Sequence, residues 1–85
     1  MPDLDMKKKL VCIEWIDADG ESGWSAYDPE AKLTTIKSFG ILVNKTDDHI
    51  AHADSYCHES KMWSGLGRIP TGMIKSVKLI AWVDL

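Results

Sequence analysis

The chain has 85 residues, of which 45% are hydrophobic and 27% charged, and its 10 basic and 13 acidic side chains give a formal net charge of −3. This length predicts a single domain, 1–85, with one small core and no room for a separate catalytic domain. Four Trp, two Tyr and one Phe argue against disorder, and no apolar run approaches the roughly 18 residues of a membrane span. We expect residues 1–8 to form a flexible N-terminus.

The charge pattern disfavours duplex nucleic acid as a partner. Recognition of DNA phosphates requires an excess of clustered Lys and Arg, whereas Lys7-Lys8-Lys9 is the one basic run. The start of the chain mixes acids and lysines and does not resemble a signal peptide. We therefore expect a cytoplasmic protein in which Cys12 and Cys57 are free thiols, and no membrane partner.

The first two expected strands have different patterns. In residues 10–16, apolar side chains alternate onto one face, as in a strand with one buried side. Residues 33–43 are rich in β-branched and aromatic side chains, but Ile36 is even-numbered whereas the following apolar set, Phe39, Ile41 and Val43, is odd-numbered. This change of parity predicts a bulge or sharp bend near Gly40.

Three further strands are expected in the second half of the chain, at 49–56, 62–69 and 75–83. Pro70 ends the fourth strand because proline has no N–H for a ladder, and residues 71–73 have room for one 3₁₀ turn. The pattern predicts an all-β, five-stranded SH3-like or Sm-like small barrel with a bent second strand and a 3₁₀ turn before the last strand. The alternative is an α+β domain in which residues 25–33 form a helix.

A resemblance to known proteins covers roughly residues 10–80. It is carried by the motifs Glu14-Trp15-Ile16-Asp17-Ala18, Gly23-Trp24, Ser38-Phe39-Gly40-Ile41-Leu42-Val43, Thr46-Asp47-Asp48-His49-Ile50 and Ile69-Pro70-Thr71-Gly72-Met73-Ile74-Lys75-Ser76. These runs resemble a group of small tailed-bacteriophage proteins of unassigned function, and the last is also similar to the end of SH3-like barrels. The resemblance implies a phage gene product in the cytoplasm of its bacterial host. It implies no activity, and the chain lacks the adjacent aromatic pair of peptide-binding SH3 domains.

Two sets of reactive side chains could in principle carry chemistry. His49, His52, Cys57 and His58 are the densest set of potential zinc ligands, but a strand points His49 and His52 to opposite faces, so we predict no metal site and no cofactor. Neighbouring Cys57 and His58 likewise face apart, which makes proton transfer between them geometrically poor. We therefore expect the protein not to be an enzyme.

The tryptophans exceed what a thin core can hold. Trp15 follows the inner face of its strand, whereas Trp24, Trp63 and Trp82 are expected at an interface or a stacking surface. These features predict a non-catalytic, homo-oligomeric binding protein that acts stoichiometrically on a host target, for example to counter a defence. The target is either a host protein or a small anionic nucleotide held between subunits, with phosphate and base bound by Arg68, Lys75, Lys78, Trp63 and Trp82. The alternative is a minor structural or assembly component of the phage particle.

Overall fold

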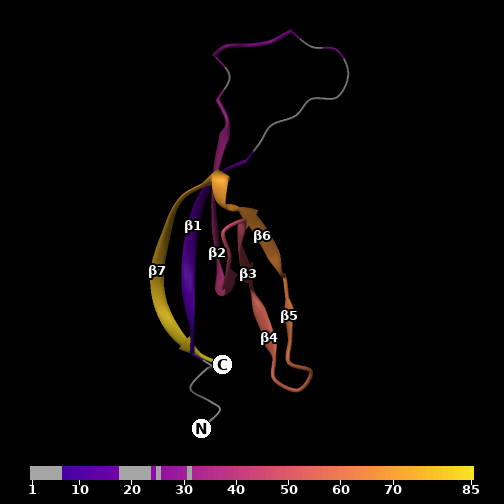
Figure 1. Ribbon diagram of the computed structural model, residues 1–85, viewed down its shortest axis with the longest axis vertical. Helices are drawn as coiled ribbons and strands as arrows, with labels where there is room; N and C mark the ends of the chain where they lie inside the picture. The colour runs from indigo at the N-terminus through magenta and orange to yellow at the C-terminus, as the bar shows by residue number, and fades with distance from the viewer. Residues whose placement is uncertain (1–6, 18–23, 25, 31) are drawn as a thin grey trace.

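The computed structural model describes residues 7–17, 24, 26–30 and 32–85 (Figure 1). It consists of strands joined by turns: β1 (Lys7–Asp17), β2 (Thr34–Lys45), β3 (His49–Ala53), β4 (Ser55–Cys57), β5 (Met62–Ser64), β6 (Gly67–Pro70), the 3₁₀ turn η2 (Thr71–Met73) and β7 (Ile74–Asp84). The all-β prediction is confirmed, with η2 directly before the last strand. In these ranges no helix is long and apolar enough to cross a membrane.

The α+β alternative is wrong for the part of 25–33 that the structure describes. Pro29 and Glu30 form a turn there, and the Glu30 backbone N–H donates a hydrogen bond of 2.9 Å to the Asp28 carboxylate. A side-chain acceptor at this spacing closes an Asx turn, and no helix follows it in the described residues of this segment. At the N-terminus β1 begins at Lys7, inside the segment expected to be flexible, and residues 1–6 lie outside the described part of the chain.

Five strands form one antiparallel sheet in the order β6-β3-β2-β1-β7. The last strand thus lies beside the first, and β1 is held between β2 and β7. In the described part of the chain neither β6 nor β7 has a strand on its outer side, so the sheet is open (Figure 1). The predicted closure into a barrel is therefore not observed in this structure.

The third and fourth expected strands form one long hairpin with a break in its middle. β3 pairs with β6 and β4 with β5, and the residue numbers of every pair in both ladders add up to the same total, so the register never slips. The break falls at Asp54 and Gly65, where the Asp54 N–H donates to the Ser64 carbonyl at 3.1 Å. Gly65 has a φ of +66°, a backbone conformation that residues other than glycine rarely adopt. A Cβ at this position would also collide with the Asp54 carboxylate.

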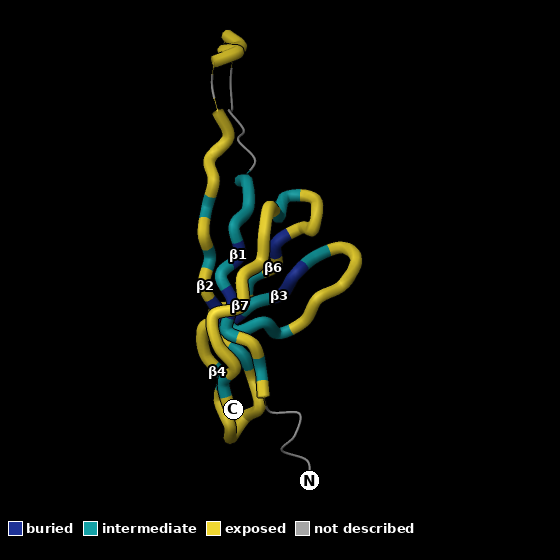
Figure 2. The backbone as a smooth tube through the Cα atoms, turned by 90° about the vertical axis from the view of Figure 1, so that its left-hand side faces the viewer, coloured by how far each residue is buried: buried dark blue, intermediate teal, exposed yellow. Residues whose placement is uncertain are grey.

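The core lies on one face of the sheet around β1. Its buried members come from β1, β3 and β6: Val11, Ile13, Ile50 and Ile69. Trp15, Leu42 and Ile74 pack against this cluster, and the Trp15 indole N–H donates to the Ser38 hydroxyl at 2.9 Å. The buried residues lie on β1, β2, β3 and β6, whereas β7 is exposed along most of its length (Figure 2).

The predicted parity change in the second strand does not occur at Gly40. Val11 pairs with Gly40 and Trp15 with Ile36, so the even-numbered residues of this stretch share the core face. Phe39 points to the opposite face and is 62% exposed. The register shift in β2 lies further on, between Leu42 and Asn44, in the ladder with β3. The prediction that Phe39 faces the core assumed that every large apolar side chain of the strand is buried.

Gly40 is required for a reason other than its φ angle. A Cβ placed there would lie 2.8 Å from the carbonyl oxygen of Ala53, on β3, and Gly40 itself is buried. Real Cβ atoms do not approach backbone oxygens this closely, so the strands would have to move apart. β2 passes from pairing with β1 to pairing with β3 at Ile41, the next residue. The absent side chain lets β3 cross close to β2 at this point.

We predict that Gly40→Ala lowers the free energy of unfolding by about 1–3 kcal/mol, because the methyl group overpacks against backbone that cannot rotate away. Urea denaturation followed by tryptophan fluorescence measures the change. Gly72→Ala is the matched control, since a Cβ at Gly72 meets no atom within 4 Å, and it should change stability by less than about 0.5 kcal/mol. Equal losses for the two variants would show that the close approach at Gly40 is not what fixes the glycine.

Candidate functional site

The five sequence-predicted binding residues lie on three different strands. Arg68 is on β6, Trp63 on β5, and Lys75, Lys78 and Trp82 on β7. β6 and β7 are the two opposite edges of the main sheet, and β5 belongs to the separate two-stranded ladder. The predicted set is therefore spread over both edges of the sheet and the far end of the long hairpin.

Trp63 is engaged in packing at the end of the hairpin. It pairs across the ladder with Tyr56, and the two ring centroids are 4.7 Å apart at an interplanar angle of 52°. His58 meets the edge of Tyr56, with centroids 5.5 Å apart at 79°. Aromatic contacts of this kind stabilise a two-stranded ladder, which is only marginally stable without them. Trp63 is half-buried by this arrangement.

Trp82 is in a different environment, near the end of β7. It is 58% exposed and pairs across the ladder with Lys9 of β1. The Lys9 ammonium lies 5.4 Å from the centroid of the Trp82 ring, a cation–π contact. Of the predicted residues, Trp82 is the one that the fold places beside clustered positive charge.

This charge surrounds a hollow of about 220 Å³ that we call the lysine hollow. The start of β1, the end of β2 and the end of β7 form it, with the lining Lys7, Lys8, Lys9, Leu42, Val43, Asn44, Lys45 and Trp82. Four lysines thus line one hollow in a protein of net charge −3. The antiparallel order brings them together, because β2 and β7 end where β1 begins.

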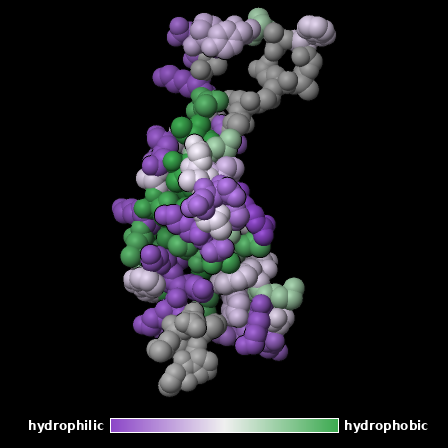
Figure 3. Space-filling model, viewed as in Figure 1, coloured by the Kyte–Doolittle hydropathy of each residue, from purple (hydrophilic) through white to green (hydrophobic). Residues whose placement is uncertain are grey.

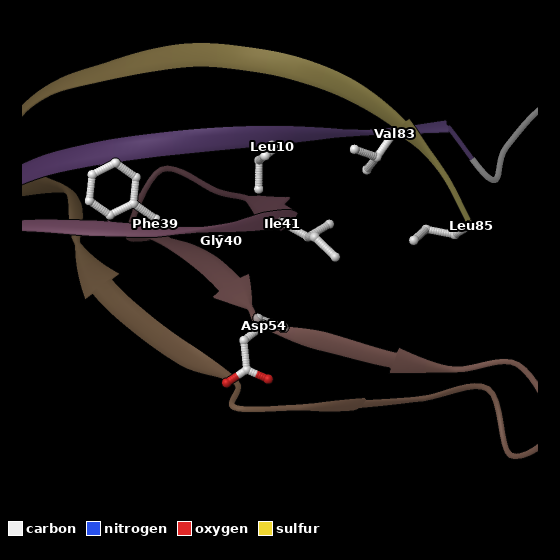
Figure 4. Close-up of a pocket in the computed structure, with 8 residues that line it drawn as sticks. Leu10, Phe39, Gly40, Ile41, Asp54, Val83 and Leu85 are labelled. Carbon is white, nitrogen blue, oxygen red and sulfur yellow. The ribbon is translucent and has the colours of Figure 1, made fainter.

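A second hollow, of about 320 Å³, is apolar. Figure 4 shows Leu10, Ile41, Val83 and Leu85 around a common space between β1, β2 and the end of β7, with Phe39 beside it. The Asp54 carboxylate, which also belongs to the lining, points away from these side chains. The lysine hollow therefore has the polar and charged groups that fix a ligand's orientation, and this second hollow offers surface for apolar contact.

The four side chains considered as potential zinc ligands lie on different segments. Across the described ranges no three His, Cys, Asp or Glu side chains are placed to hold a metal ion. His49 and His52 lie on β3, whereas Cys57 ends β4 and His58 begins the turn that follows. His52 faces the backbone of β6, since a Cβ on Gly67 would lie 2.9 Å from its Nε2 atom.

Cys57 has a lowered pKa. Hydrogen bonding from the Ser60 hydroxyl, reinforced by the backbone N–H groups of Ser60 and Glu59, lowers the pKa of the Cys57 thiol below its ordinary value. These donors lie in the tight turn 58–61, which is closed by a hydrogen bond of 2.8 Å from the Lys61 N–H to the Cys57 carbonyl. The thiol is exposed, and Cys12, the other cysteine, is half-buried.

Comparison with models of protein families, with curated proteins and with solved structures finds no match for this chain. The candidate site is therefore defined by its geometry and charge alone. Sequence reasoning found the run Lys7-Lys8-Lys9 and found Trp82, but it did not connect them, and it gave Lys45 no role. These residues could have been connected by predicting that the first strand begins at Lys7 and pairs with both the second strand and the last.

We predict that Cys57 reacts with iodoacetamide faster at neutral pH than an unperturbed thiol, because its lowered pKa increases the fraction of reactive thiolate. In a Cys12→Ser background, Ser60→Ala removes the principal donor, so the midpoint of the rate against pH should move to higher pH. Ser55→Ala, on the same hairpin, is the control and should leave the midpoint unchanged. A midpoint that Ser60→Ala does not move would contradict the assigned cause.

Proposed function

We propose that this protein is a non-catalytic binding protein of a phage that acts stoichiometrically, as a symmetric homo-oligomer, on a target in the cytoplasm of the bacterial host, countering a host defence. The phage origin rests on the motif resemblance described above. The binding role is supported by one structural observation, the long and uncovered edge strand β7.

β7 extends the core beyond its covered part. Leu79 pairs with Val11 and Val77 with Ile13 on the core face, and Val11 and Ile13 are 1% and 0% exposed. Their partners on β7 nevertheless remain 46% and 42% exposed. Figure 3 shows apolar atoms among hydrophilic ones along the side of the body where Figure 1 places β7. A strand or side chains added at this edge would complete the burial of the core row.

The two edges of the sheet are not equally suited to pairing. β6 is four residues long and ends in Pro70, which has no N–H to donate. β7 is 11 residues long and contains no proline. Between two copies, β6 could pair with β7 over at most the four residues of β6, whereas two β7 strands could pair over all 11 residues. We therefore favour a twofold dimer in which two β7 strands pair antiparallel.

We place the centre of this pairing at Ile80, near the middle of β7. Ile80 falls at the register shift between β7 and β1, where Leu10 pairs with Ala81 and Val11 with Leu79. It is 48% exposed and has no partner in β1. Its side chain is therefore more available to a second copy than to its own core.

The finer fold assignment belongs to the same proposal. The order β6-β3-β2-β1-β7, with the last strand beside the first, is consistent with an SH3-like or Sm-like small barrel opened between β6 and β7. We propose that the protein belongs to this architecture, with its uncovered edge closed by a second copy.

We predict that light scattering on the eluted peak of size-exclusion chromatography gives twice the chain mass of 9.5 kDa at tens of micromolar protein. Ile80→Lys should give the single-chain mass, because it opposes two lysines across the axis, and like charges directly opposite destabilise a strand pair. The control is Leu66→Lys, the same kind of change at a side chain 41% exposed away from β7, and it should remain a dimer. A wild-type protein of single-chain mass at these concentrations would refute the dimer.

A structural role in the phage particle is the second candidate, favoured by the same exposed β7. Mass spectrometry of purified virions separates the two functions. We expect the protein to be absent from particles, because a factor that acts on the host has no reason to be packaged. Its presence in a fixed copy number would support the structural role instead.

A further inference from the structure

We propose that the lysine hollow binds a nucleoside phosphate, with Lys7, Lys9 and Lys45 holding the phosphates and Trp82 stacking on the base. This inference rests on the proposed binding function and gives it a ligand class and a site. It moves the phosphate contacts away from Arg68, Lys75 and Lys78, to residues that one chain brings together by itself.

The first support is an excess of positive charge at one place. Among the residues that the structure describes, the lining of the hollow has four lysines and no carboxylate. Asp84 meets Lys7 at 3.8 Å, but both side chains are largely exposed, at 83% and 65%, so this ion pair is screened by water. Within the same described ranges, Lys8, Lys9 and Lys45 have no ion-pair partner. A compact anion with several charges would relieve their mutual repulsion.

The second support is the indole beside these cations. The Lys9 ammonium lies over the Trp82 ring, and the ring is 58% exposed. A base that stacks on the open part of this ring would place its attached phosphates close to Lys9. Leu42 and Val43 add apolar surface to the lining, and the Asn44 side chain offers both an N–H donor and a carbonyl acceptor for a base edge. A phosphate without a ring would use only half of this site.

The size and position of the hollow favour a single nucleotide over a strand. Its volume is about 220 Å³, and its cations gather at one end of the sheet. A protein that binds single-stranded nucleic acid needs a positive groove that follows several phosphates, and the net charge of −3 works against a long polyanion. We therefore assign a mononucleotide as the ligand.

Isothermal titration of the full chain tests the assignment, with ATP, GTP, CTP and UTP as probes. Tripolyphosphate supplies the anion without the ring, adenosine the ring without the anion, and a short oligothymidylate the strand. We expect at least one nucleoside triphosphate to bind, tripolyphosphate to bind about tenfold more weakly, and adenosine to give no heat. Binding should weaken as ionic strength rises.

Two pairs of matched variants locate the site. Lys45→Gln should weaken nucleotide binding about tenfold, whereas Lys37→Gln, which removes one positive charge elsewhere on β2, should not change it. Trp82→Ala should weaken it about tenfold, whereas Trp24→Ala, at a fully exposed side chain in the loop before β2, should not. Circular dichroism of each variant checks that the sheet is retained.

Four results would overturn the assignment. These are no heat from any of the four triphosphates, equal affinity for tripolyphosphate and the best nucleotide, no effect of Lys45→Gln and Trp82→Ala, and tighter binding of the oligothymidylate than of every nucleotide. The mass of each sample is measured in parallel. A dimer that binds no nucleotide would overturn this inference and leave the proposed self-association standing.

Discussion

The incomplete cover of β1's core row is the constraint on which the rest of the structure depends. β1 lies between β2 and β7, and its side chains Val11 and Ile13 are fully buried, but no strand of the described part of the chain lies beyond β7. A chain of 85 residues has few residues left to form a second layer over the sheet. The apolar residues of β7 thus border the core and are also exposed to solvent. A partner that packs on them would complete their burial.

The same antiparallel order produces the concentration of charge. Lysines near the start of β1 and the end of β2 are 36 or more residues apart in sequence, and Trp82 is further still. They meet because β1 runs antiparallel to both β2 and β7, so that the start of β1 lies beside the ends of these two strands. The net charge of the chain is negative, so this grouping is a local property of the fold. Composition alone, which argued against polyanions, could not reveal it.

The sequence predicted the fold well where local pattern and burial agree. Alternation located β1, and β-branched residues located β2, while Pro70 with the short turn after it located the 3₁₀ segment before β7. It failed at Phe39, where a large apolar side chain lies on the outer face, and it gave the wrong reason for Gly40, whose need arises from the approach of β3. The exposure of Phe39 and the need for Gly40 both depend on which segments pack against each other. The pattern of a single strand does not contain this information. The lysine hollow was missed for the same reason, since Lys45 becomes significant only through pairing.

Self-association and ligand binding are physically coupled in this arrangement. In a β7 pair centred on Ile80, Trp82 lies next to Val77 and Leu79 of the second copy on the core face, and it also lines the lysine hollow. A nucleotide stacked on that indole would then use a ring that the second copy packs in place, and it would bind the dimer more tightly than the single chain. By linkage, the ligand stabilises the dimer by the same factor by which the dimer favours the ligand. A stoichiometric protein built in this way would be most fully assembled when its target is abundant.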